Sequence, residues 1–142
     1  MANNALIEHI LNQRRFAVLG VSRDPEKYGY KVFKSLKTAG MTVFAINPNA
    51  DQIEDDPCYP SLDNVPGEID VLVTVTPPDV TNETLPQAGR LRIPFCWMQV
   101  GSYNEASINL ARAHAMQVIA DGSCIMVAAG RLRAKEVAEM LE

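Results

Sequence analysis

The sequence predicts an α/β protein whose doubly wound, five-stranded parallel sheet lies between two helical layers. Apolar runs typical of buried parallel strands recur along the chain, helical patterns separate them, and small or polar residues follow each run. Strands that alternate with helices form a parallel sheet with right-handed crossovers. We therefore expect a Rossmann-like, three-layer α/β/α fold, with the strands numbered along the chain in the order 3-2-1-4-5.

Each element follows from a local pattern. The expected strands cover residues 16–21, 42–46, 69–75, 95–100 and 117–120. The expected helices cover residues 3–13, 29–39, 79–90, 104–115 and 130–141, with a short helical turn near 61–64. In the helix at 29–39, apolar residues recur at helical spacing opposite Lys31, Lys34 and Lys37. No repeat or linker interrupts the chain, so we expect one domain over residues 1–142.

Charge and composition argue against several classes of function. The formal net charge is −4, which argues against nucleic acid as the main partner. No apolar run approaches the ~20 residues of a membrane span, and the N-terminus lacks the pattern of a signal peptide. Cys58, Cys96 and Cys124 are too few and too scattered for a disulfide framework or a zinc site. We expect a cytoplasmic protein with no metal.

The charges are distributed unevenly. Seven basic residues and two acidic ones lie between Arg14 and Lys37, whereas residues 51–70 contain seven acidic residues and no basic one. A positive region in the first of these segments would attract a small anion. We interpret the three lysines of the helix at 29–39 as its solvent-facing row. Arg23 and Lys27, which precede that helix, are better ligand candidates.

The most informative segment is Ala17-Val-Leu-Gly-Val-Ser-Arg-Asp24, in which an apolar strand runs into a turn of small residues. A helical pattern resumes at about Gly29. A strand, a tight turn and a helix N-terminus direct free backbone N–H groups at one point, which favours phosphate. Ligands of parallel sheets bind outside the carboxyl ends of the strands, so a nucleotide-type ligand is the first hypothesis. The alternative is structural, because such loops are generally rich in Gly, Pro, Ser and Asn.

Two features argue against NAD as this ligand. The glycine fingerprint GxGxxG is absent after the first strand. The second strand ends in Asn47 and Pro48, where an NAD-binding protein would carry an acidic residue for the ribose hydroxyls.

Five motifs in order resemble the small stand-alone CoA-binding proteins: Gly20-Val-Ser-Arg-Asp-Pro-Glu-Lys-Tyr-Gly-Tyr, Ile46-Asn-Pro, Ile69-Asp-Val-Leu-Val, Trp97-Met-Gln-Val-Gly and Cys124-Ile-Met. Those proteins are similar to the N-terminal domain of the succinyl-CoA synthetase α subunit. The resemblance covers residues 14–127 and implies coenzyme A, or an acyl-CoA, as the ligand. The binding residues that it implies are Gly20, Val21, Ser22, Arg23, Lys27, Tyr28, Asn47, Pro48, Thr76, Pro77, Pro78, Gln99, Gly101 and Cys124.

The resemblance also implies a role for each part of this set. The turn from Gly20 to Arg23 would hold the CoA phosphates, with added charge from Lys27. The segment after the second strand would border the adenosine of CoA. The segment after the third strand would line one side of the binding site, and Trp97 to Gly101 would form its floor by the fourth strand. The chain departs from many relatives at Asp121-Gly-Ser-Cys124, where they read Asp-Arg-Cys. That departure removes a basic group near the fifth strand.

No catalytic set is evident in the sequence. His9 and His114 fall within predicted helices, so we expect both to be structural. Cys96 is expected in the core and Cys58 in an exposed loop, while Cys124 is either a structural thiol or a group at the pantetheine end. We therefore expect a non-catalytic module that binds CoA, with a protein partner left open. The alternatives are a subunit or fragment of an acyl-CoA ligase or synthetase, and an NAD(P)-binding oxidoreductase.

Overall fold

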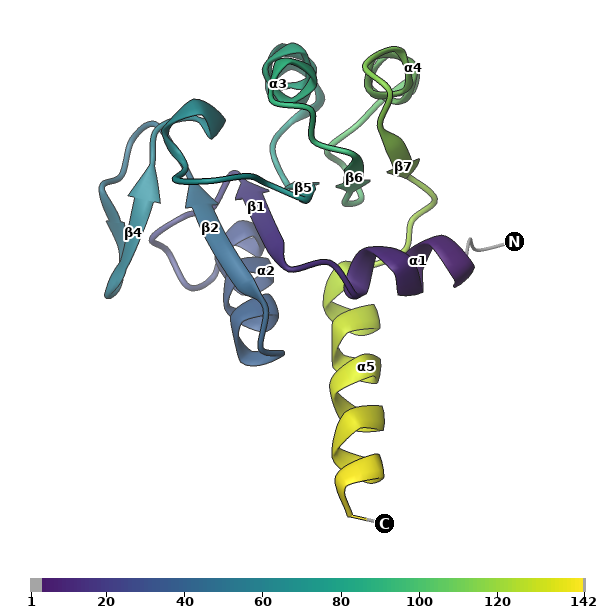
Figure 1. Ribbon diagram of the computed structural model, residues 1–142. Coiled ribbons are helices and arrows are strands. Elements are labelled where there is room, and N and C mark those ends of the chain that lie inside the picture. Colours follow the sequence, from purple (N-terminus) through teal and green to yellow (C-terminus); the bar gives the residue numbers. More distant parts are fainter. Residues whose placement is uncertain (1–3, 142) are drawn as a thin grey trace.

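The computed structural model describes residues 4–141, in which helices cover both faces of one seven-stranded sheet (Figure 1). The strands are β1 (Arg15–Leu19), β2 (Thr42–Ile46), β3 (Gln52–Ile53), β4 (Asp56–Tyr59), β5 (Val71–Thr74), β6 (Phe95–Met98) and β7 (Gln117–Ile119). The helices are α1 (Asn4–Leu11), α2 (Tyr28–Thr38), α3 (Pro78–Arg90), α4 (Glu105–Ala113) and α5 (Ile125–Met140), with a 3-10 helix η1 (Leu62–Asn64). The fold class expected from the sequence is confirmed, because the sheet is mostly parallel and lies between two helical layers.

The number and order of the strands differ from the prediction. The order is β3-β4-β2-β1-β5-β6-β7, and β3 runs antiparallel to β4. The third predicted strand, β5, pairs with β1, with Ala17 opposite Leu72. The place beside β2 belongs instead to β4. The predicted number of five strands is therefore wrong, and so is the predicted position of the third strand beside the second. Within β3 and β4 only Ile53 and Cys58 are buried, so no apolar run marks these strands in the sequence.

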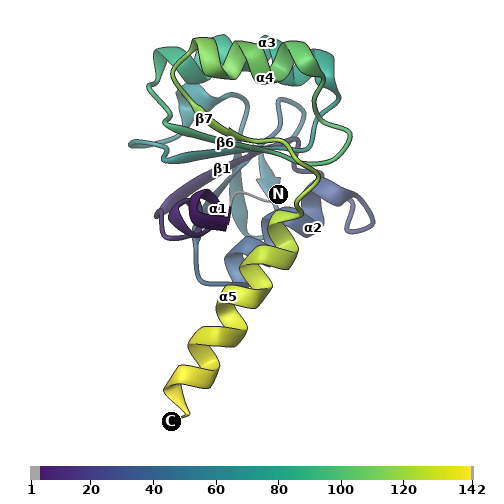
Figure 2. The same ribbon diagram turned by 90° about the vertical axis from the view of Figure 1, so that its right-hand side faces the viewer.

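Two apolar cores separate the sheet from its helical layers. On one face α3 and α4 cover a core that includes Leu72, Leu85 and Met98. On the other face α1, α2 and α5 cover a core that includes Phe33 and Trp97. Figure 2 shows that α5 then runs away from the sheet, so that its C-terminal half stands clear of the other elements. No helix within residues 4–141 combines the length and apolarity needed to cross a bilayer.

The last helix begins five residues before its predicted start at residue 130. Residue 124 precedes α5 in extended backbone and offers no capping side chain, so the sequence carries no start signal there. Ile125 and Ala129 lie one turn apart and are both buried in the core, which explains why the helix includes them. The first predicted helix is also shorter than expected, and its residue 3 lies outside the described residues.

The two oppositely charged segments of the chain lie against each other. Lys34 of α2 forms an ion pair with Glu54 at 2.7 Å, and Lys37 pairs with Asp56 of β4. The contact with Lys34 lowers the pKa of the Glu54 carboxyl and raises the pKa of the lysine. The lysines of this row that pair with acidic residues, Lys34 and Lys37, keep part of their side chains exposed to solvent. The cations that form no ion pair within residues 4–141 include Arg23, Lys27 and Lys31.

Candidate functional site

Two glycines fix the junction between β1 and α2. Gly20 has a φ of +98°, and a Cβ atom there would lie 2.8 Å from Cγ2 of Thr76 in the loop after β5. A Cβ atom on Gly29 would lie 2.1 Å from the carbonyl oxygen of Gly20. The first turn of α2 therefore packs directly on the end of β1. Our sequence interpretation did not include Gly29 in the site, although a glycine inside a helix is a signal of close packing.

The backbone donors at the end of β1 are already engaged. The N–H groups of Gly20 and Val21 both donate to the carbonyl oxygen of Ile46, at 3.0 and 3.3 Å. The side chain of Val21 is fully buried in the core. These two predicted site residues therefore position the turn, and their N–H groups are not free for a ligand.

Two cations follow in the loop from Ser22 to Lys27, and free N–H donors follow in the first turn of α2. The Ser22 hydroxyl accepts a 3.0 Å hydrogen bond from the N–H group of Asp24, which shapes the start of this loop. Lys27 is the N-cap residue of α2, and no side chain caps the helix. The N–H groups of residues 28–30 have no hydrogen-bond acceptor in the described part of the chain. An uncapped helix N-terminus beside the exposed Arg23 and Lys27 is a favourable place for an anion.

Asn47 ties the end of β2 to the same turn. Its Nδ2 atom donates to the carbonyl oxygen of Val21 at 2.8 Å, and its Oδ1 atom accepts from the N–H group of Asn49 at 2.8 Å. Pro48 lies exposed between them. Asn47 therefore supports the turn, and neither Asn47 nor Pro48 offers a carboxylate at the end of β2 that could bind ribose hydroxyls.

The loop after β5 lies on the other side of β1. The Thr76 and Thr81 hydroxyls are 2.8 Å apart, and Pro77 is the N-cap residue of α3, which begins at Pro78. Thr76 is the residue that leaves no room for a side chain at Gly20. This places the predicted segment 76–78 beside the phosphate-binding turn that the sequence predicts.

Three predicted residues from distant parts of the chain meet at the ends of β6 and β7. The Tyr28 hydroxyl donates to Oε1 of Gln99 at 3.0 Å and lies 3.3 Å from Sγ of Cys124. Gln99 is fully buried, and its Oε1 atom also accepts from the N–H group of Ile125 at 3.2 Å. Burial, and then the contact with Cys124, raises the pKa of Tyr28, so the phenol keeps its proton even in alkaline solution.

Buried hydrogen bonds hold this cluster in place. The Ser102 hydroxyl donates to the carbonyl oxygen of Gln99 at 2.7 Å and lies 2.8 Å from the hydroxyl of Thr74. Nε1 of Trp97 donates to the carbonyl oxygen of Ser123 at 3.0 Å, which fixes the turn before Cys124. The sequence places the segments that contain Thr74, Ser102 and Ser123 at this edge, but our sequence interpretation did not include these residues in the binding set, because single hydroxyl residues carry no motif.

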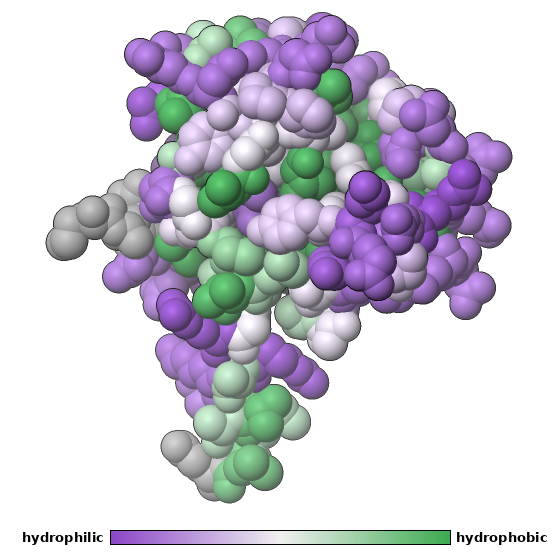
Figure 3. All heavy atoms as spheres, turned by 180° about the vertical axis from the view of Figure 1, so that it is seen from behind, coloured by the Kyte–Doolittle hydropathy of each residue, from purple (hydrophilic) through white to green (hydrophobic). Residues whose placement is uncertain are grey.

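The predicted site residues thus lie along one edge of the sheet, at the carboxyl ends of β2, β1, β5, β6 and β7. With ~4.8 Å between neighbouring strands, this carboxyl edge spans ~19 Å. Figure 3 shows the molecule from this side, with apolar and weakly polar side chains in the middle and mostly hydrophilic ones around them. Gly101 has a φ of +87° and open space around it. None of the described hydrogen bonds joins the contact between Tyr28, Gln99 and Cys124 to the remaining predicted residues Arg23, Lys27, Pro48 and Gly101.

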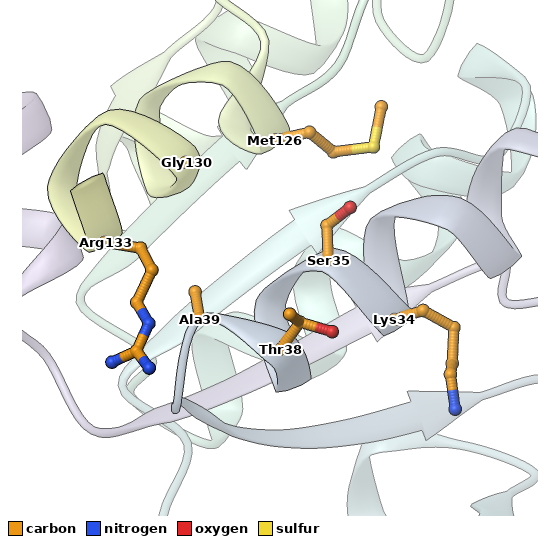
Figure 4. A pocket seen from close by; sticks show the side chains of 7 residues that line it. All are labelled: Lys34, Ser35, Thr38, Ala39, Met126, Gly130 and Arg133. Carbon is orange, nitrogen blue, oxygen red and sulfur yellow. The ribbon is translucent and has the colours of Figure 1, made fainter. Parts of the chain in front are cut away.

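Two hollows lie beside α5. One, of about 650 Å³, lies between α1 and α5 and has Ser123 and Cys124 in its lining. The other, of about 340 Å³, lies between α2 and α5 and contains none of the predicted site residues (Figure 4). In Figure 4, Arg133 and Lys34 lie on opposite sides of this hollow, and the Lys34 side chain points away from Arg133. This direction is consistent with the ion pair between Lys34 and Glu54. The second hollow therefore lies outside the candidate site.

The groups that could act as nucleophiles or bases lie mostly away from the carboxyl edge. His9 packs against the ring of Phe95 at 5.2 Å, and His114 caps the end of α4. Cys58, expected in an exposed loop, is instead a buried residue of β4. Within residues 4–141, no three His, Cys, Asp or Glu side chains gather as metal ligands.

Comparison with known proteins identifies the relatives of this chain. Residues 14–129 match the family described as "CoA binding domain". The chain is 35% identical over 85 residues to the acetate–CoA ligase [ADP-forming] II subunit alpha of Pyrococcus furiosus, which covers 59% of this chain and 19% of that one. It is 30% identical over 131 residues to the uncharacterized protein YneT of Bacillus subtilis, and this match covers 89% of this chain and 93% of YneT. This chain thus spans less than a fifth of the ligase subunit.

Solved structures give the same result for the fold. A hypothetical protein from Pyrococcus horikoshii matches with a TM-score of 0.86 and 28% identity, over 92% of both chains. A dinucleotide-forming acetyl-coenzyme A synthetase of Candidatus Korarchaeum cryptofilum, in complex with phosphate and ADP, matches with a TM-score of 0.73 and 27% identity. That match covers 82% of this chain and 27% of the synthetase. The resemblance inferred from the motifs is confirmed.

Proposed function

Because the chain belongs to the family of CoA-binding domains, we propose that it binds coenzyme A or an acyl-CoA along the carboxyl edge of its sheet. The observation that carries the proposal is the uncapped N-terminus of α2, held against the end of β1 by Gly20 and Gly29. Its free N–H groups, with Arg23 and Lys27, suit the pyrophosphate and the 3′-phosphate of CoA. The long arm of the ligand would then follow the edge toward β6 and β7.

The same geometry favours CoA over NAD. NAD lacks the additional phosphate on the ribose, and Asn47 stands at the end of β2 where its usual carboxylate partner would be. The side chain of Asn47 is engaged in holding the turn. These features support a ligand that is recognised through its phosphates.

We further propose that this chain binds its ligand without catalysing a reaction on it. Support comes from the positions of His9, on α1 against Phe95, and His114, at the end of α4, because both lie away from the carboxyl edge. The three free cysteines are consistent with a reducing compartment such as the cytoplasm. A second candidate is a ligase subunit that acts with a separate chain, which the match to an acetate–CoA ligase subunit favours. If the purified protein alone releases CoA from acetyl-CoA in the presence of ADP and phosphate, the non-catalytic proposal is wrong.

Calorimetric titration with CoA, dephospho-CoA and NAD tests the ligand. We expect a micromolar or tighter Kd for CoA, weaker binding of dephospho-CoA because it lacks the 3′-phosphate, and much weaker binding of NAD. Equal affinities for CoA and NAD, or no heat on titration with CoA, would contradict the proposal.

A further inference from the structure

The contact between Tyr28, Gln99 and Cys124 leaves a buried hydrogen-bond donor unused. Gln99 is fully buried, and its Nε2 atom has no acceptor among the described residues. The amide cannot be turned over, because its oxygen faces the N–H group of Ile125, which can only donate. Buried donors are nearly always paired in folded proteins. A ligand that brings an acceptor to this position would therefore be stabilised.

A second donor lies directly beside the sulfur of Cys124. The Tyr28 hydroxyl is 3.3 Å from Sγ and carries its proton at neutral pH, and burial raises the pKa of Tyr28 further. If Cys124 becomes a thiolate, the Tyr28 O–H can turn to it, because the Ile125 N–H still pairs with the Gln99 oxygen. The sulfur also lies at the N-terminus of the 16-residue helix α5, which attracts negative charge. Cys124 thus has a hydroxyl donor and a helix N-terminus beside its sulfur.

Cys124 differs from the other two cysteines in access. It is half-buried and lines the hollow of about 650 Å³ between α1 and α5, together with Arg131 and Lys135. Cys96 is fully buried, which raises the pKa of its thiol to about 12. Cys58 is buried in β4, and burial raises the pKa of its thiol as well. Exchange requires an accessible thiolate, so Cys124 is the cysteine suited to it.

We propose that Cys124 reacts with CoA disulfide and retains one CoA as a mixed disulfide, a covalent, redox-dependent form of the proposed CoA site. The Cys124 thiol first loses its proton to solvent, and the thiolate attacks one sulfur of CoA disulfide. The bond from Sγ to that sulfur forms as the original disulfide bond breaks, and the second CoA leaves as a thiolate that takes up a proton. Gln99, whose Nε2 atom has no acceptor among the described residues, adjoins this step through its contact with Tyr28. One disulfide is consumed and one is formed, so CoA disulfide is the oxidant.

Peptide mapping by mass spectrometry after incubation with CoA disulfide tests this inference. Glutathione disulfide, which offers the same bond without a nucleotide, is the reference reagent. We expect the adduct at Cys124 to form at least about tenfold faster with CoA disulfide, because the bound nucleotide raises the local concentration of the disulfide. The variant Cys58→Ser should react like the wild type, and Tyr28→Phe should react several-fold more slowly while remaining folded by circular dichroism.

Reversible binding of CoA to the reduced wild-type protein, measured in parallel, separates this inference from the proposed function. If CoA binds but Cys124 gains no adduct, or reacts equally fast with both disulfides, the inference is wrong and the proposed function stands. If CoA does not bind reversibly, the proposed function is wrong and the inference fails with it. A folded Tyr28→Phe variant that reacts at the wild-type rate would contradict the role of the hydroxyl.

Discussion

The segment that links β1 to α2 has two parts with opposite properties. Its ends, Gly20, Val21 and Gly29, are packed so closely that a Cβ atom on Gly29 would lie 2.1 Å from a backbone oxygen. Its middle, from Ser22 to Lys27, is mostly exposed and holds cations without ion-pair partners among residues 4–141. The sequence motif alone predicts one phosphate-binding turn and does not distinguish the packed ends from the exposed middle.

The difference separates positioning from binding. The packed ends engage their own donors within the fold, since Gly20 and Val21 both donate to Ile46. Their contribution is to place the uncapped first turn of α2 at the carboxyl edge. The exposed middle contributes little to the core, so its charges remain available to a ligand. Changes in the two parts should therefore have different consequences.

Gly29→Ala should give the largest effect, on folding stability. The new methyl group would overlap the carbonyl oxygen of Gly20, and relief requires α2 to move away from β1. We expect a loss of about 3 kcal/mol in the free energy of unfolding, measured by urea denaturation. Gly130→Ala is the matched control, because a Cβ atom there meets nothing within 4 Å in the helix α5.

The control should raise stability by up to about 1 kcal/mol, the difference in helix propensity between the two residues. Equal effects of the two substitutions would show that the junction is not tightly packed. In that case the proposed division between positioning and binding would lose its structural basis.

Arg23→Ala should affect binding and leave folding almost unchanged. The side chain is exposed and forms no ion pair within the described residues, so its removal empties no core site. We expect the Kd for CoA to rise about 10- to 100-fold, the usual effect of losing a charge-assisted contact, as measured by calorimetry. Lys31→Ala, an exposed cation further along α2, is the control and should change the Kd much less. A destabilised Arg23→Ala variant with wild-type affinity would reverse the assignment.

Most of the fold could be predicted from the sequence, and the exception has a physical cause. The strands β1, β5 and β6 are buried on both faces almost throughout, and β2 and β7 are buried toward their carboxyl ends, so apolar runs mark all five. The pair β3 and β4 lies at the edge of the sheet, where only Ile53 and Cys58 are buried and Pro57 is exposed. Such a strand is defined by its neighbour β2 and not by its own pattern.

The site was predictable in its location and much less so in its contacts. Parallel topology brings the strand ends together, so the residues after β1, β2, β5, β6 and β7 could be grouped in advance. The hydrogen bonds of Tyr28 to Gln99 and Cys124 join residues 71 and 96 positions apart, which no local pattern encodes. Similarly, the engagement of Asn47 with Val21 depends on the register between β1 and β2.

The central claim is that CoA binds at the carboxyl edge and through the first turn of α2. Titration of the ¹⁵N-labelled protein with CoA, followed by amide NMR spectra, measures this at each residue. We expect the amide signals of Tyr28, Gly29 and Tyr30 to shift most, because these N–H groups have no acceptor within residues 4–141. Signals of Ser35 and Gly130, in the hollow between α2 and α5, should stay in place. Shifts concentrated in that hollow, with an unchanged first turn of α2, would contradict the account.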